Sequence, residues 1–326
     1  MYQPTDPHVW NGRNDALDGS AGYRWHHVVQ CVDLSLGNLD TLIDDGKPVA
    51  ILGFCSDEGV KHNQGRPGAK EGPAVFRKVA SNLAWHETES ELLIDAGDVI
   101  CLPDGLEEAQ AVLATKVAKL INAECLPIVI GGGHEVAFGN FMGISQASEK
   151  KTGIINIDAH FDLRSMTSSP SSGTPFWQIS EWCKQHKVPF DYMCIGIQEQ
   201  ANTQILFDRA EALGVKYILA DQVHEQSVDR TIIMIDDFMS RCDQIYLTIC
   251  LDVFDASCAP GVSSPSVNGL WSAQVLPIVR HLAHTGKLIS CDIAELNPAF
   301  DIDQRTAKLS TKMAYELAKV YWAHSG

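Results

Sequence analysis

The stretch GIINIDAHFD, residues 153–162, decides the fold. Its first half is an apolar, β-branched run, as expected of a strand that is buried on both faces in a parallel sheet covered by helices. Its second half places carboxylate and imidazole side chains directly after that strand. Because ligands in open α/β sheets bind at the carboxyl ends of the strands, the stretch predicts both the fold class and the position of the site.

Similar apolar runs recur along the chain, with helical patterns between them. The predicted strands are 48–54, 91–99, 126–130, 153–157, 192–197, 216–219, 244–251 and 287–293. The predicted helices are 72–85, 106–123, 203–213, 229–242, 272–285 and 304–323. This alternation predicts an α/β fold, a three-layer αβα sandwich around a mainly parallel sheet. No linker divides the chain, so we expect one domain over residues 1–326, with residues 1–45 as an N-terminal extension that packs on it.

Composition limits the possible partners. The 326 residues include 25 Lys+Arg against 41 Asp+Glu, a formal charge of −16, which argues against binding to nucleic acid or to an anionic membrane surface. No apolar run is long enough to span a bilayer, and the first residues have no signal-peptide core. The ten cysteines are scattered without a CxxC pair, as in reduced cytoplasmic proteins. We therefore expect a cytoplasmic protein that binds a small molecule, and an anionic one is compatible if the pocket supplies an arginine.

Asp158, His160 and Asp162 carry the first chemical signal. In an extended segment, residues i, i+2 and i+4 point to one side, so these three side chains converge. Such a group is costly unless a cation neutralises it, and a divalent metal does so directly. The alternative is a set of solvated loop residues or a capped helix start.

Two further segments end in possible ligands. GGGHE, residues 131–135, follows the strand at 126–130 and places His134 at the sheet edge, and it lacks the Lys-Ser/Thr ending of a phosphate-binding loop. In YLTICLD, residues 246–252, Cys250 and Asp252 share a face by strand alternation. Mixed nitrogen and oxygen ligation suits Mn²⁺, Fe²⁺, Co²⁺ or Zn²⁺.

These segments together resemble a known family. GGGHE, NIDAHFD and LDVFDASCAPG, flanked by NQGRPGA at 63–69 and DIAELNP at 292–298, are similar to the signatures of the arginase/agmatinase (ureohydrolase) superfamily. The resemblance covers roughly residue 50 to the C-terminus. It implies an arginase-like sandwich that holds up to two Mn²⁺ ions, in a protein that can be a homo-oligomer.

The resemblance also implies a ligand set. The expected metal ligands are His134, Asp158, His160, Asp162, Cys250 and Asp252, with Asp158 bridging the two ions. Cys250 departs from the family, because it stands where a second bridging aspartate is usual, and a thiolate is softer than Mn²⁺ prefers. The site could hold a Cys-ligated pair, one tight and one weak ion, or a neutral thiol that does not ligate. We expect Cys250 next to the metals, with a weakened or thiolate-tuned second ion; the alternative is an ordinary buried cysteine.

Substrate contacts follow from the same resemblance. Glu295 is expected to pair with a cationic N–C–N group, and Asp162 to carry a proton to the leaving nitrogen. Arg164 and Phe176 stand where arginases carry an asparagine and a histidine, and a guanidinium suits a substrate that ends in carboxylates. Asn202, with Thr203, is expected either to bind the substrate or to cap a helix. Arg66 is expected to stabilise its own turn, with binding of the substrate carboxylates as the alternative.

HFDLR, SGTPFWQI and IGIQEQANT resemble the formimidoylglutamase branch of the superfamily. This implies metal-dependent hydrolysis of N-formimidoyl-L-glutamate, a dicarboxylate, to L-glutamate and formamide in histidine degradation. One alternative is an agmatinase or guanidino-acid hydrolase. A second alternative, from another class, is a metal-poor binding protein without catalysis, because the loss of a bridging aspartate at Cys250 is how such a site would decay.

Overall fold

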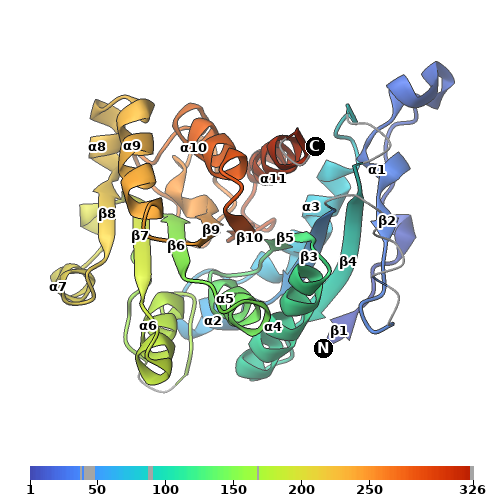
Figure 1. Cartoon of the computed structure of the whole chain (residues 1–326). Helices are drawn as coiled ribbons and strands as arrows, with labels where there is room; N and C mark the ends of the chain where they lie inside the picture. Colours follow the sequence, from blue (N-terminus) through green and yellow to red (C-terminus); the bar gives the residue numbers. More distant parts are fainter. Residues whose placement is uncertain (37–38, 40–47, 87–90, 167–168, 324–326) are drawn as a thin grey trace.

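A long, mainly parallel sheet forms the centre of the molecule (Figure 1). The computed structural model describes residues 1–36, 39, 48–86, 91–166 and 169–323. Its 10-stranded sheet has the order β1-β4-β3-β5-β10-β9-β6-β7-β8, and β2 also pairs with β4. The strands are β1 (Tyr2–Gln3), β2 (Gln30–Cys31), β3 (Val49–Cys55), β4 (Leu93–Ile100), β5 (Leu126–Ile130), β6 (Thr152–Ile157), β7 (Asp191–Ile197), β8 (Lys216–Leu219), β9 (Gln244–Cys250) and β10 (Leu288–Ala294). β1 pairs antiparallel with β4, and the other pairings are parallel.

Helices cover both faces of this sheet (Figure 1). One face carries α3 (Gly72–Ala80), α9 (Val228–Met239), α10 (Ser272–His284) and α11 (Arg305–Ala323), and the other carries α4 (Leu106–Asn122), α5 (Val136–Ala147) and α6 (Pro175–His186). Strand alternation divides the core accordingly, since Ile155 and Ile157 pack with α10 and α11 while Ile154 packs with α5 and α6. The predicted αβα sandwich is confirmed.

The sequence did not predict α5 and α6, and it placed the end of α3 at residue 85, whereas α3 ends at Ala80. α5 is apolar on most sides and contains two glycines, which weaken a helical pattern. Both glycines face α4: a Cβ on Gly139 would lie 2.9 Å from Leu113 Cδ2, and one on Gly143 would lie 2.7 Å from the Ala114 carbonyl oxygen. The glycines therefore serve close packing of the two helices.

The described part of the expected N-terminal extension packs against the sheet. β1 and β2 add to β4, and the Trp10 indole Nε1 donates to the Asp95 carboxylate at 2.6 Å. Asp95 is itself paired with the buried Arg77 guanidinium at 2.7 Å. Residues 37–38 and 40–45 of that extension lie outside the described residues.

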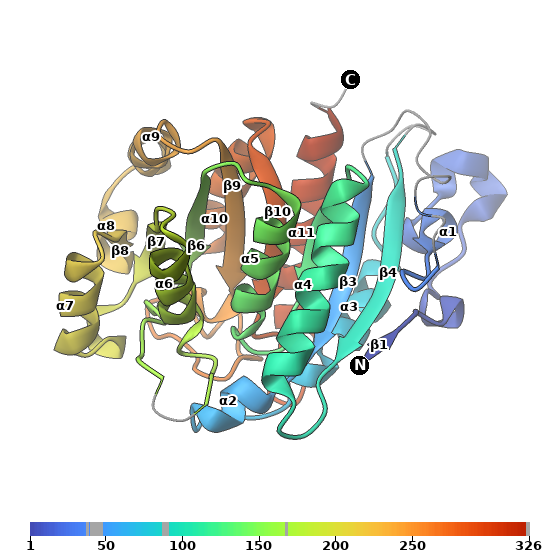
Figure 2. The ribbon, with the colours of Figure 1, turned by 60° about the horizontal axis from the view of Figure 1, so that its bottom comes forward.

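The remaining helices are short or lie toward one edge of the sheet: α1 (Trp25–Val28), α2 (Glu58–His62), α7 (Gln204–Ala212) and α8 (Ala220–Glu225). Figure 2 shows α2 at the end of the sheet toward which the parallel strands point, beside the loop between β6 and α6. That end of the sheet is where ligands bind in this class of fold. Within the described residues, every helix is either too short or too polar to cross a membrane.

Candidate metal centre

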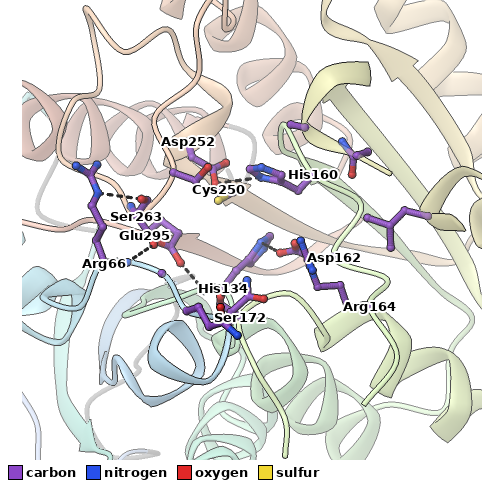
Figure 3. A pocket seen from close by; sticks show the side chains of 17 residues that line it. Arg66, His134, His160, Asp162, Arg164, Ser172, Cys250, Asp252, Ser263 and Glu295 are labelled. Carbon is purple, nitrogen blue, oxygen red and sulfur yellow. Dashed lines mark hydrogen bonds and ion pairs between the residues drawn. The ribbon is translucent and has the colours of Figure 1, made fainter. Parts of the chain in front are cut away.

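A cavity of about 380 Å³ opens at the carboxyl ends of the central strands. The loops after β3, β5, β6, β9 and β10 all contribute to its wall, and Figure 3 shows their side chains converging. The predicted site residues in its lining are His134, His160, Asp162, Arg164, Asn202, Cys250, Asp252 and Glu295. Asp158 is fully buried and contacts two of these side chains, His134 and His160. Every predicted site residue therefore lies at or directly beneath one cavity.

His134 is held in one orientation by contacts on both ring nitrogens. Its Nδ1 lies 3.0 Å from Asp158 Oδ2 and 2.9 Å from Asp162 Oδ2, while Nε2 lies 2.9 Å from the Thr248 hydroxyl. Thr248 donates its own proton to Asp292 at 2.6 Å, so its oxygen accepts from Nε2 and Nδ1 faces the carboxylates. Burial alone would lower the pKa of His134, but the two carboxylates outweigh it and raise the pKa. The same field attracts a metal cation to Nδ1.

Asp158 links two groups of possible ligands. His134, Asp158 and Cys250 form one group and Asp158, His160 and Asp252 the other, and within each group the ligand atoms lie within 4.8 Å of one another. His160 Nδ1 lies 3.2 Å from Asp252 Oδ2. The other oxygen of Asp252, Oδ1, is buried without a hydrogen-bond partner among the described residues. An unpartnered carboxylate oxygen beside two overlapping ligand groups fits a pair of divalent ions, with Asp158 placed where the bridge was predicted.

Two acidic residues reach the cavity from a strained backbone. Asp162 has a φ of 48° and Glu295 a φ of 70°, in the left-handed region that non-glycine residues seldom adopt. Such strain costs on the order of 1–3 kcal/mol and persists where the surroundings enforce it, commonly at active sites. Both carboxylates are thereby turned into the cavity, as the predicted roles in proton transfer and substrate pairing require.

The Glu295 carboxylate is held by two backbone groups. The His134 amide donates to Oε1 and the Ser263 amide donates to Oε2, each at 3.3 Å. Burial and the nearby carboxylate of Asp252 raise the pKa of Glu295 to about 8. A cationic group opposite Glu295 would favour its charged form, because opposite charges at close range stabilise each other.

Cys250 lies beside the predicted metals, at the end of β9. Its thiol is buried and lines the cavity next to the Asp252 and His160 side chains (Figure 3). Burial and the surrounding carboxylates, Asp158 first among them, raise the pKa of the thiol. Ligation through a thiolate therefore needs a cation next to the sulfur. The placement is as expected, and ligation itself stays a prediction.

Arg164 and Arg66 both line the cavity but differ in their partners. The Arg66 guanidinium donates to the carbonyls of Ser263 at 3.0 Å and Val262 at 2.5 Å and lies 4.0 Å from the centre of the Phe300 ring, which matches the structural role expected for it. The exposed Arg164 guanidinium has no hydrogen-bond or ion-pair partner among the described side chains and carbonyls. Arg164 is therefore available to a ligand.

Asn202 lines the cavity, but the backbone around it uses its amide. Its Nδ2 donates to the carbonyls of Ala159 and Gln198, both at 2.9 Å, and its Oδ1 accepts from the Phe161 amide at 3.0 Å. Thr203, not Asn202, occupies the N-cap position of α7. A substrate-binding role for Asn202 stays a prediction, and these bonds favour a role in holding the loop after β7.

Several residues that support the predicted ligands are not indicated by the motifs in the sequence. Thr248 stands on β9 two residues before Cys250, so strand alternation places both side chains on one face. The predicted alternation does not continue to Asp252, because β9 ends at Cys250 and Leu251–Val253 form a 3-10 turn. Asp292 accepts from Asn140 at 2.8 Å and from the Tyr246 hydroxyl as well as from Thr248, and nothing local in the sequence indicates this network. Glu135, next to His134, is buried, although the GGGHE motif alone does not indicate a separate role for it.

Comparisons with known proteins agree with this geometry. The model of the Arginase family matches residues 47–319. A formimidoylglutamase from Aeromonas hydrophila is 43% identical over 320 residues, 98% of this chain and 99% of that relative. A Trypanosoma cruzi formiminoglutamase with Mn²⁺ is 26% identical, with a TM-score of 0.77 over 86% of this chain and 94% of that one. Formimidoylglutamase from Bacillus subtilis, 23% identical, shares the fold, with a TM-score of 0.76 over 85% of this chain and 88% of that one. The chain belongs to the arginase family.

Proposed function

We propose that this chain hydrolyses N-formimidoyl-L-glutamate to L-glutamate and formamide, in histidine degradation. The observation that carries the proposal is a buried carboxyl group and an unpaired guanidinium in one cavity. Figure 3 shows Glu295 and Arg164 on opposite sides of the predicted metal ligands that it labels, His134, His160, Asp162, Cys250 and Asp252. A buried carboxylate suits an amidinium, and an unpaired guanidinium suits carboxylates. The substrate of the 43%-identical relative, a formimidoylglutamase by name, carries both groups.

The protein side chains have separate tasks in this reaction. Glu295 binds the two nitrogens of the amidinium and orients its carbon toward the ligand cluster, while Arg164 holds the glutamate end. Divalent ions held by His134, Asp158, His160, Asp162, Cys250 and Asp252 would lower the pKa of a bound water and supply hydroxide at neutral pH. Asp162, whose Oδ2 lies 2.9 Å from His134 Nδ1, takes up the proton of the water-derived hydroxyl and delivers it to the glutamate nitrogen as the bond from that nitrogen to the amidine carbon breaks and the carbonyl of formamide forms.

We infer that the ions are Mn²⁺, as in the Mn²⁺-bound relative from Trypanosoma cruzi, and that up to two bind per chain. Asp158 is shared by both ligand groups, which supports a pair rather than a single ion. Cys250 offers one donor atom where a bridging carboxylate offers two, so we expect the second ion to be held more weakly.

The decisive assay compares formimidoylglutamate, agmatine and arginine as substrates, each with and without added Mn²⁺. The proposal expects Mn²⁺-dependent release of formamide from formimidoylglutamate. Turnover of agmatine or a guanidino acid in its place would favour another activity of the superfamily. If the protein hydrolyses none of these compounds, and elemental analysis finds no bound Mn²⁺, a non-catalytic binding protein would be favoured.

The cellular setting is part of the same proposal. All ten cysteines are free, as expected in the reducing cytoplasm, and the partner is a small dicarboxylate. Self-association into a homo-oligomer stays a prediction, to be measured by light scattering.

A further inference from the structure

We propose that Glu135 is a positioning residue that ties the metal-ligand loop to the loop bearing Arg164, and so sets the affinity for the substrate's carboxylate end. The inference rests on the proposed function for the identity of that substrate and for the role of Arg164 in binding it. Glu135 directly follows His134 in GGGHE, yet it is absent from the cavity lining, so it has to act through its neighbours.

The Glu135 carboxylate is fully buried between two loops. Its Oε1 accepts a hydrogen bond from the Ser56 hydroxyl at 2.8 Å and another from the Gly59 amide at 3.1 Å. Ser56 follows β3, and Gly59 lies in the first turn of α2. One side chain from the loop after β5 thereby fixes the start of the segment after β3.

The surrounding backbone leaves room for this carboxylate. A Cβ on Gly59 would lie 2.5 Å from the Glu135 Oε2, and one on Gly133 would lie 2.1 Å from the same oxygen. Such distances are far below van der Waals contact, so any larger residue at either glycine would displace the carboxylate or the loop. The Glu135 carboxylate therefore fits at this place only because both neighbouring positions are glycine.

The contacts continue from Gly59 to Arg164. The Gly59 carbonyl accepts from the Ser172 amide at 2.9 Å, and the Nδ2 of Asn63, the residue after α2, donates to the Ser172 hydroxyl at 3.1 Å. The next residue, Gly173, accepts from the Arg164 amide through its carbonyl at 2.9 Å. A chain of hydrogen bonds therefore leads from Glu135 to the backbone of Arg164.

Loss of the Glu135 side chain is expected to weaken substrate binding without disturbing the metal ligands. His134 is fixed independently by Thr248, Asp158 and Asp162, so loss of the Glu135 side chain leaves the metal ligands in place. The 169–174 segment loses its indirect support, and Arg164 loses its fixed approach to the substrate. We expect the KM for formimidoylglutamate to rise while kcat and Mn²⁺ content are kept.

The test uses the full-length Mn²⁺ enzyme with Glu135→Ala, Glu135→Gln and a matched control, Gln110→Ala. Gln110 is also buried and donates to the Glu135 carbonyl at 2.8 Å, so its loss removes a hydrogen bond at the same residue without touching α2. Glu135→Ala is expected to raise KM roughly tenfold, the effect of one to two hydrogen bonds. Glu135→Gln, which keeps an acceptor oxygen, should restore most of the affinity, and Gln110→Ala should leave KM unchanged.

A double-mutant cycle shows whether Glu135 acts through Arg164. In an Arg164→Ala background, Glu135→Ala should add little to KM, because its target is already gone. Equal KM in the Glu135→Ala and Gln110→Ala enzymes, full additivity with Arg164→Ala, or loss of Mn²⁺ with unchanged KM would overturn the inference. Ser56→Ala, expected to raise KM less, serves if Glu135→Ala does not fold.

Hydrogen exchange gives a readout that does not depend on the substrate. Glu135→Ala should speed exchange of the Ser172 amide relative to Gln110→Ala, because the Gly59 carbonyl that accepts it is no longer anchored. Unchanged Ser172 exchange would overturn the inference even in an enzyme that turns over formimidoylglutamate. Failure of the wild-type protein to hydrolyse that compound would instead count against the proposed function alone.

Discussion

Replacement of Arg164 by alanine is expected to weaken binding of formimidoylglutamate without disturbing the metal centre. Arg164 lines the cavity, and its guanidinium has no partner among the described residues, so its truncation breaks no internal hydrogen bond. The cost of the substitution should therefore fall on the substrate's carboxylates and not on folding.

The expected rise in KM depends on how exposed the Arg164 side chain is to solvent. A hydrogen bond to a charged group contributes about 1.5–3 kcal/mol. Arg164 is exposed, so solvent screens it and the lower end of that range applies. About 1.5 kcal/mol corresponds to a rise in KM of roughly tenfold.

The assay is steady-state release of formamide at saturating Mn²⁺, with elemental analysis of the same samples. Arg241→Ala is the matched control, because Arg241 is also exposed but pairs with Asp237 on α9, away from the cavity. Arg164→Ala should raise KM with kcat within about twofold and an unchanged Mn²⁺ content. An unchanged KM, or a fall in kcat alone, would refute the assignment of Arg164 to the carboxylate end.

Four further predictions test the other site residues and the stability of the surrounding fold. Cys250→Asp should strengthen Mn²⁺ binding, measured by titration with the apoprotein; unchanged affinity would place the sulfur outside the coordination sphere. Glu295→Gln should lower kcat/KM by at least about tenfold while Mn²⁺ content stays constant, because a neutral amide binds the amidinium more weakly. Thr248→Val should weaken Mn²⁺ binding by roughly 10–100-fold and Thr248→Ser far less, since serine keeps the hydroxyl that orients His134. Hydrogen bonds from Arg280, and then from Lys312, lower the pKa of Glu316 to about 2. The charged carboxylate therefore stabilises the fold above its ordinary pKa, and this stabilisation is lost as the pH falls toward 2. Urea unfolding should show that Glu316→Gln lowers the free energy of unfolding by about 1 kcal/mol at pH 7, and that this difference vanishes near pH 2.

The elements that could be predicted from sequence are those whose pattern is local. The buried strands are each readable within ten residues, because strand alternation fixes which side chains share a face. The same alternation predicts that Asp158, His160 and Asp162 converge. They do lie at one site, but through a bent loop and not an extended segment, since β6 ends at Ile157 and Asp162 has a φ of 48°; their role as metal ligands stays a prediction. α5 could not be predicted, since its glycines are explained only by contact with α4. The hydrogen bonds that fix Glu135 and Asp292 likewise join segments far apart in the chain, and no local pattern encodes them.

The position of β10 has a consequence for synthesis of the protein. β10 lies between β5 and β9, although the chain makes it after both. The middle of the sheet therefore cannot be completed until residue 294 has been made, because without β10 both β5 and β9 lack a neighbour. Glu295, which completes the cavity, follows β10 immediately. A nascent or prematurely terminated chain that lacks β10 therefore has neither a continuous sheet nor the carboxylate that would bind the amidinium. Substrate can bind as proposed only after nearly the whole polypeptide has been made.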